Sequence, residues 1–185
     1  MAKYTQLASD MFEKIQLNAG VICTGFNTDT GEVTGIIGAT TGGVAFADTP
    51  EFVDFGDDID NCPKNTMELK RIDSREVKLS GTYVSVDAAS VASMMGAADA
   101  SGIAITPRDD LKTTDFKTVW WVGDYSDVDG GFLAIELKNA LSTGGFQIQS
   151  SDKAKGQFAF EYTAHYSVSN MDEVPYKFYI KAGEA

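Results

Sequence analysis

The stretch QFAFEYTAHYS, residues 157–167, alternates between two kinds of side chain along its whole length. Every second residue is apolar or aromatic, namely Phe158, Phe160, Tyr162, Ala164 and Tyr166. The residues between them are mostly polar, namely Gln157, Ala159, Glu161, Thr163 and His165. Successive side chains of a β-strand point to opposite faces, so the pattern predicts a long strand with one face on a core.

Shorter stretches on the N-terminal side of this strand, and one after it, carry the same signature. Strands are predicted at residues 21–26, 67–86, 103–105, 117–123, 133–138, 146–148 and 176–180. The stretch 117–123 holds Trp120 and Trp121 between valines, which predicts burial on both faces. Within 67–86 the parity of the valines changes near Gly81, which predicts a β-bulge there.

One internal helix is predicted at residues 87–96. Asp87 is suited to the N-cap, and Gly96 stands where a glycine often ends a helix. A second, N-terminal helical stretch is predicted at residues 5–16. Seven or more strands with one main helix predict a mainly-β sandwich or barrel. The length of 185 residues suits a single domain, 1–185, with its own core.

Residues 27–66 form the least regular part of the sequence. Turn-forming Gly, Asn and Asp are frequent there, and aromatic residues lie among acidic ones. The segment includes Phe46, Phe52, Phe55, Asp57, Asp58 and Asp60. A long irregular segment with exposed aromatics predicts a loop that becomes ordered against a neighbouring molecule.

The formal net charge of −12 limits the possible partners. Such a surface repels nucleic-acid phosphates, so sequence-blind DNA binding through charge is nearly excluded, and docking on anionic membranes is disfavoured. No run of about 18 apolar residues predicts a membrane span, and the N-terminal residues lack a secretory signal. Cys23 and Cys62 form no CxxC motif, so we expect two free thiols in a reducing cytoplasm.

No catalytic, cofactor or metal site is predicted, and we expect the protein not to be an enzyme. His165 is the single histidine, and the glycine-rich stretch 38–43 lacks the Lys-Ser/Thr ending of a phosphate-binding loop. Asp127, Asp129 and Glu136 have partial EF-hand spacing, but Tyr125 occupies position 1 and cannot supply the required carboxylate.

Several local patterns together resemble a known family. They are QLNAGVI (16–22), FNT (26–28), GATTGG (38–43), PEFVD (50–54), IDN (59–61), VKLSGT (77–82), MMGA (94–97) and GQFAFEYTAH (156–165). In this order they resemble the major tail proteins, or tail tube proteins, of tailed bacteriophages and prophages. The resemblance spans roughly residues 16–170.

The resemblance implies a β-sandwich or split barrel with a flanking short helix, a long inter-subunit loop and an N-terminal arm. Such proteins form hexameric rings that stack into a tube through which viral DNA passes without specific binding. It implies a location in the virion tail after assembly in the bacterial cytoplasm. Further implied partners are tape measure, terminator and distal tail proteins.

The resemblance assigns roles to two sets of residues, and for the first set the strand parity selects them. Glu136 and Glu161 are predicted to face an acidic lumen, because each lies on the polar parity of an alternating strand. The residues named above within 27–66 are predicted to contact the adjacent ring.

Two other readings of the sequence stay open. One is another phage-derived assembly subunit, such as a neck, terminator or baseplate protein or the tube of a tail-like bacteriocin. The other is a carbohydrate-binding or adhesion β-sandwich module, whose aromatic platform would come from Trp120, Trp121 or Tyr125.

Overall fold

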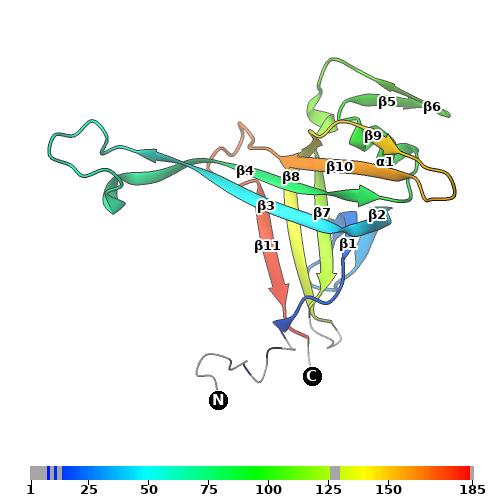
Figure 1. Ribbon diagram of the computed structural model, residues 1–185, viewed down its shortest axis with the longest axis horizontal. Coiled ribbons are helices and arrows are strands. Elements are labelled where there is room, and N and C mark those ends of the chain that lie inside the picture. The colour runs from blue at the N-terminus through cyan, green and yellow to red at the C-terminus, as the bar shows by residue number, and fades with distance from the viewer. Residues whose placement is uncertain (1–7, 9–10, 12–13, 126–129, 184–185) are drawn as a thin grey trace.

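The computed structural model describes the whole chain except residues 1–7, 9–10, 12–13, 126–129 and 184–185 (Figure 1). Within the described residues the chain forms eleven strands and one α-helix. They are β1 (Val21–Phe26), β2 (Val33–Gly38), β3 (Thr40–Asp54), β4 (Lys70–Tyr83), α1 (Ala88–Met94), β5 (Ala98–Ser101), β6 (Ala104–Pro107), β7 (Lys117–Asp124), β8 (Phe132–Ser142), β9 (Gln147–Gln149), β10 (Gln157–Ala164) and β11 (Tyr176–Lys181). The predicted mainly-β fold with one short helix is confirmed. The predicted N-terminal helix and arm fall mostly outside the described residues.

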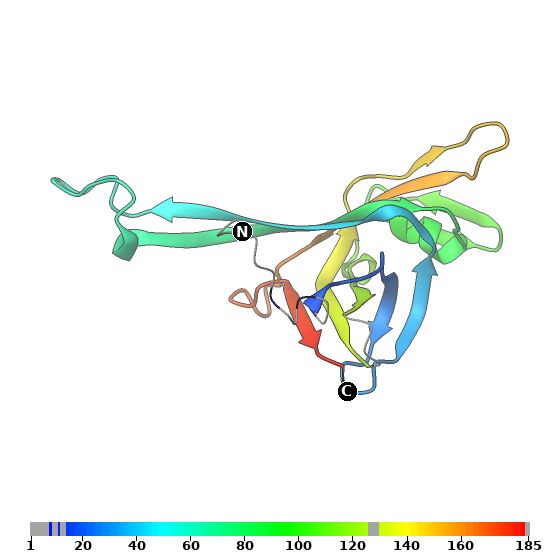
Figure 2. The ribbon, with the colours of Figure 1, turned by 60° about the horizontal axis from the view of Figure 1, so that its bottom comes forward.

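Nine of the strands form two antiparallel layers that share one strand, while β5 and β6 pair with each other in a separate small sheet (Figure 2). One layer has the order β2-β1-β7-β8-β11, and the other has the order β3-β4-β10 with β9 added to β10. Residues 132–137 of β8 pair with β11, whereas Leu141 and Ser142 pair with β10. The sheet therefore folds over itself at β8, as in a split barrel.

The corner in β8 is made at Asn139. Its φ of 47° lies in the left-handed region, and the register between β7 and β8 shifts at the same place. The Asn139 side-chain amide donates a hydrogen bond to the carbonyl of His165, 3.0 Å away. Asparagine tolerates this backbone region better than most residues, so the bend falls where the sequence supplies one.

The main core lies between the two layers. Its buried members come from both, and include Ile22, Val77, Leu79, Tyr83, Val119, Ile135, Leu137, Phe160 and Tyr162. A second, smaller core lies on the opposite face of the β1-β7-β8 layer, formed by Cys23, Trp120, Val122, Phe132 and Ala134. Because β7 contributes to both cores, its predicted burial on both faces is confirmed.

The predicted helix at 87–96 is confirmed as α1. Asp87 accepts a hydrogen bond from the Ser90 amide, and Ser90 Oγ accepts one from the Asp87 amide, which completes a capping box. Gly96 has a φ of 78°, as a C-terminal glycine of a helix should. Ser142 Oγ donates to the Met94 carbonyl over 2.8 Å, so the helix end is fixed to β8.

The expectation that residues 27–66 are a long irregular loop is wrong for most of the segment. Residues 33–38 and 40–54 are the strands β2 and β3, and β3 pairs with β4 from Thr40 to Asp54. Pro50 is tolerated because β3 pairs with β4 alone among the described strands, so its other edge is open. The turn residues that suggested a loop belong to a bulge and to the hairpin tip.

The bulge predicted near Gly81 lies on the neighbouring strand β3 instead. β4 continues through Gly81 to Tyr83, while Gly42 and Gly43 of β3 form the insertion between the pairs Thr41–Thr82 and Val44–Gly81. Gly81 has a different role, since a Cβ there would lie 2.8 Å from the Phe160 ring. The parity change in the sequence reflects the end of β4 at Tyr83.

A pair of substitutions tests the corner at Asn139. Asn139→Gly and Asn139→Ala both remove the bond to the His165 carbonyl, but only alanine carries a Cβ into the left-handed region. We expect the alanine variant to be less stable than the glycine variant by about 1 kcal/mol, measured by urea unfolding. Equal stabilities, or a more stable alanine variant, would show that the bend does not depend on this conformation.

Candidate assembly surfaces

The distal halves of β3 and β4 leave the body as a long two-stranded hairpin (Figures 1 and 2). A second register shift, between Glu51 and Phe52, places Asp73 of β4 without a directly paired partner. Beyond it the ribbon continues to the Asp54–Lys70 pair and closes through a turn that includes the short 3₁₀ helix Met67–Leu69. We call residues 52–72 the arm.

Large apolar side chains on the arm are exposed. Phe52 is 54% exposed, Phe55 is 63% and Met67 is 78%, and Val53, Ile59 and Ile72 are also exposed. Phe52 and Ile72 are directly paired across the two strands, so they extend one apolar face. An isolated two-stranded ribbon has no second layer to cover such a face and is only marginally stable in water. The arm therefore presents a surface suited to another molecule.

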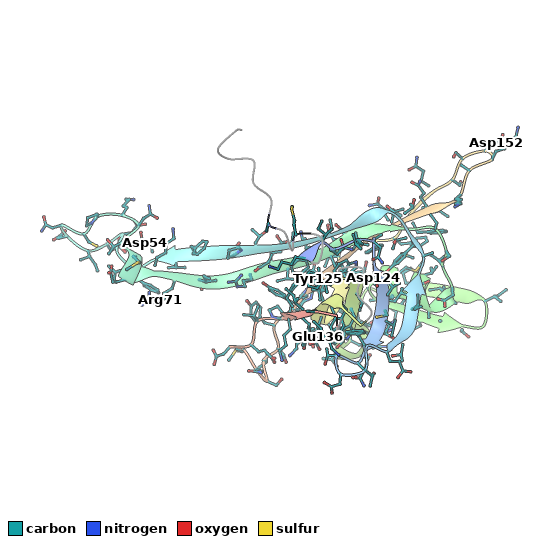
Figure 3. The ribbon with its side chains drawn as sticks, turned by 90° about the horizontal axis from the view of Figure 1, so that it is seen from below. Asp54, Arg71, Asp124, Tyr125, Glu136 and Asp152 are labelled. Atoms are coloured by element: carbon teal, nitrogen blue, oxygen red, sulfur yellow. The ribbon has the colours of Figure 1, made fainter. Side chains whose placement is uncertain are left out.

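The tip of the arm nevertheless has a defined shape, because the Asp54 carboxylate accepts two backbone hydrogen bonds. One carboxylate oxygen accepts the Gly56 amide at 2.9 Å, and the other accepts the Asn65 amide at 2.7 Å. These two backbone bonds lower the pKa of Asp54. Figure 3 shows Asp54 where the tip begins, with Arg71 on the opposite strand. The sequence prediction missed this residue because its partner Asn65 is distant in the chain.

The base of the hairpin is tied to the body by a polar cluster. Arg75 forms an ion pair with Asp48 across the ribbon, and both side chains are largely buried. The Tyr176 hydroxyl donates to the same Asp48 oxygen over 2.8 Å, which connects β3 to β11. The direction in which the arm leaves the body is therefore fixed by contacts between both layers.

Five of the six residues predicted for the inter-ring loop lie on the arm. Phe52 belongs to its ribbon, while Phe55 and the three aspartates belong to its tip, where Asp57 pairs with Lys64 at 3.3 Å. The sixth, Phe46, is not in a loop. It packs on the main core with its ring 5.3 Å from that of Tyr176, because its position in β3 faces inward opposite Leu79.

The layer β2-β1-β7-β8-β11 ends in two open edges. Among the described strands β2 pairs with β1 alone, and β11 pairs with β8 alone. Each edge leaves backbone N–H and C=O groups without strand partners, which is the usual template for adding a strand from another molecule. The two edges lie at opposite ends of the same layer.

The structure does not bring the two predicted lumen acids together. Glu161 lies on the outer face of the β3-β4-β10 layer, where its carboxylate is 3.7 Å from the Lys78 ammonium. Glu136 lies on the other layer, on the face of the second core, and accepts a hydrogen bond from the Tyr179 hydroxyl at 3.0 Å. A wall built from one layer can therefore display only one of them.

The face of β8 that carries Glu136 is also less polar than its parity suggested. Ala134 and Phe132 on the same face are buried in the second core, and Trp120 is the direct neighbour of Glu136 on β7. Burial of the hydroxyl raises the pKa of Tyr179, and the contact with Glu136 raises it further. The Glu136 carboxylate therefore makes its contact with Tyr179 within the molecule.

The residues considered for other chemistry have structural contacts. His165 Nδ1 is 3.2 Å from the Asn139 carbonyl, and its ring meets Phe116 edge to face. Cys23 and Cys62 are both free thiols, and burial raises the pKa of Cys23. Asp127 and Asp129 lie outside the described residues. Within the described residues, no three His, Cys, Asp or Glu side chains are grouped to hold a metal.

The two tryptophans are packed inside the molecule. Trp120 is buried in the second core, and Trp121 packs on the main core while its indole N–H donates to the Ala19 carbonyl at 2.9 Å. They point to opposite faces of β7, so they form no common platform for a sugar ring.

Comparison with known proteins assigns no family to the chain. No protein-family model matches the chain, and no curated protein matches it in sequence. In the part of the chain that the structure describes, no helix has the length and apolar character needed to cross a membrane.

The role of Asp54 can be tested by amide hydrogen exchange. We expect Asp54→Asn to speed exchange at Gly56 and Asn65, because a neutral amide is a weaker acceptor for their N–H groups than a carboxylate. Asp58→Asn, at an exposed position of the same tip, is the matched control and should leave both rates unchanged. Unchanged exchange in the Asp54 variant would show that its carboxylate does not organise the tip.

The lowered pKa of Asp54 also gives a pH dependence with a defined sign. A carboxyl whose pKa is depressed in the folded arm stabilises it above the ordinary pKa of about 3.9. The contribution is lost as the pH falls through the lower value in the folded arm. We expect protection of Gly56 and Asn65 to decrease at acidic pH in the wild type more than in the Asp54→Asn variant.

Proposed function

We propose that the protein is a structural subunit that assembles into hexameric rings, which stack into the tail tube of a bacteriophage or related particle. The observation that carries the proposal is the arm, whose apolar side chains are exposed in the single chain. A ribbon of this kind is stabilised when a neighbouring subunit covers it. The tube would join tape measure, terminator and distal tail proteins at its ends.

The open edges of the β2-β1-β7-β8-β11 layer support ring formation. If β2 of one copy pairs with β11 of the next, the same contact repeats around an axis, and closed symmetry follows when the rotation closes. Such pairing satisfies the backbone groups that the single chain leaves open. This contact differs from that of the arm, so ring closure and stacking use separate surfaces.

The outer face of the β3-β4-β10 layer is the better candidate for the channel wall. It carries mainly small or polar side chains, including Ala45, Ala47, Thr49, Ser80, Thr82, Ala159, Glu161 and Thr163. Such a wall offers little apolar surface for nucleic-acid bases to stack on. On the same face Glu76 and Glu161 both pair with Lys78, which leaves one net negative charge from this trio in each subunit. Repeated around a ring, this charge adds a negative potential that repels phosphates and favours passage over binding.

Other phage-derived assembly subunits remain the second candidate, since an exposed arm and open edges would serve a neck, terminator or baseplate protein equally well. The adhesion module has less support, because Trp120 and Trp121 are packed on opposite faces of β7.

Shortening the arm tests the proposed function. Replacing residues 52–73 by Asn-Gly keeps the Glu51–Ser74 and Pro50–Arg75 pairs and closes them with a two-residue hairpin turn. We expect concentrated wild-type protein to form tubes in negative-stain electron microscopy. We expect the shortened variant to keep its fold by circular dichroism and to form no tubes, because its stacking surface is gone.

A point variant separates the apolar face from the length of the arm. Phe52→Ser combined with Ile72→Ser should also abolish tubes, whereas Ile103→Ser, at an exposed turn outside the arm, should leave them intact. Tubes of normal length from the shortened protein would remove the arm from the proposal. A wild-type protein that stays monomeric at every concentration and salt would overturn the tube function itself.

A further inference from the structure

Two hairpins project from opposite ends of the molecule. The arm extends from one end, and the hairpin of β9 and β10, residues 147–157, extends from the other (Figure 2). Figure 3 shows the labelled residues Asp54 and Arg71 at the first end and Asp152 at the second. A contact between the two ends of different copies would join subunits head to tail without using the ring edges.

The arm tip combines negative charge with exposed apolar surface. Asp58 and Asp60 are exposed, and neither has an ion-pair partner among the described residues. Ile59 lies between them and is 50% exposed, and Phe55 is exposed nearby. Asp57 is already paired with Lys64, so Asp58 and Asp60, which flank the exposed Ile59, are the tip aspartates left for a partner.

The β9–β10 hairpin has the complementary character. Lys153 and Lys155 are exposed at its turn, and neither forms an ion pair within the part of the chain that the structure describes. Ile148 of β9 is 61% exposed. Asp152 lies in the same turn, so the hairpin has a net charge of +1, in a chain whose net charge is −12.

We propose that the arm tip of one copy binds the β9–β10 hairpin of another copy, with Asp58 and Asp60 facing Lys153 and Lys155. Ile59 and Phe55 would pack against Ile148 in the same contact. The inference rests on the proposed stacking of rings and names the surface that receives the arm. Because the two surfaces differ, the contact is heterologous and can repeat without end along an axis.

Two other hollows on the body are less suited to an acidic tip. The hollow beside β1 and β7 contains Asp124, and the hollow beside Gly144 and Gly145 contains Glu161. An acidic tip would be repelled by both. A single exposed ion pair adds little net affinity, so charge here selects the partner and register, while the apolar contact supplies more of the affinity.

Charge exchange in the full-length protein tests the contact. Variant one carries Asp58→Lys and Asp60→Lys, variant two carries Lys153→Glu and Lys155→Glu, and variant three combines all four. We expect variants one and two to lose tubes in electron microscopy and sedimentation velocity, and variant three to regain them. Lys112→Glu with Lys117→Glu is the control, because it changes the net charge as much as variant two but lies outside the hairpin.

The outcomes separate this contact from the proposed function. Tubes from variant two equal to the wild type, no recovery in variant three, or equal loss in the control would each overturn the contact while leaving tube formation established by the wild type. A wild type without rings or tubes would instead overturn the proposed function.

Discussion

The structure depends on one strand serving two layers. β8 pairs with β7 and β11 along its first part and with β10 at its end, and the bend at Asn139 makes this change of partner possible. The backbone must enter the left-handed region there, and the asparagine amide ties the bend to the His165 carbonyl. Because the layers close over one core only when β8 turns at this point, the positions of β10, β4 and β3 follow from it.

The arm follows from two irregularities in the pairing of β3 with β4. Gly42 and Gly43 adjust the register at the start of β3, so that Phe46 still faces the core. The second shift, opposite Asp73, marks where the ribbon leaves the body. Between them, Asp48, Arg75 and Tyr176 hold the ribbon against β11. The molecule thus places stable packing at the base of the hairpin and uncovered apolar surface at its end.

Acidic residues serve different purposes at different places in the fold. Asp54 and Asp87 accept backbone hydrogen bonds, which lowers the pKa of each carboxyl and fixes a turn or a helix end. Glu136 is used within the molecule through Tyr179. Asp58 and Asp60 form no ion pair with any other residue that the structure describes, and Glu161 faces outward beside Lys78. The net charge alone therefore says little about function until these groups are separated.

The mainly-β fold, the helix after Asp87 and the core face of β10 could be predicted from the sequence, because these depend on side-chain periodicity and on caps within a few residues. Five of the six residues predicted for the inter-ring loop also lie on the arm, since aromatics among acids are a local signal. Only the tertiary structure decided that 33–38 and 40–54 are strands, that Phe46 is a core residue and that Glu136 and Glu161 lie on different layers. Pairing partners, bulges and the fold of β8 over two layers involve residues distant in the chain, and no local pattern records which face of a strand will meet which neighbour.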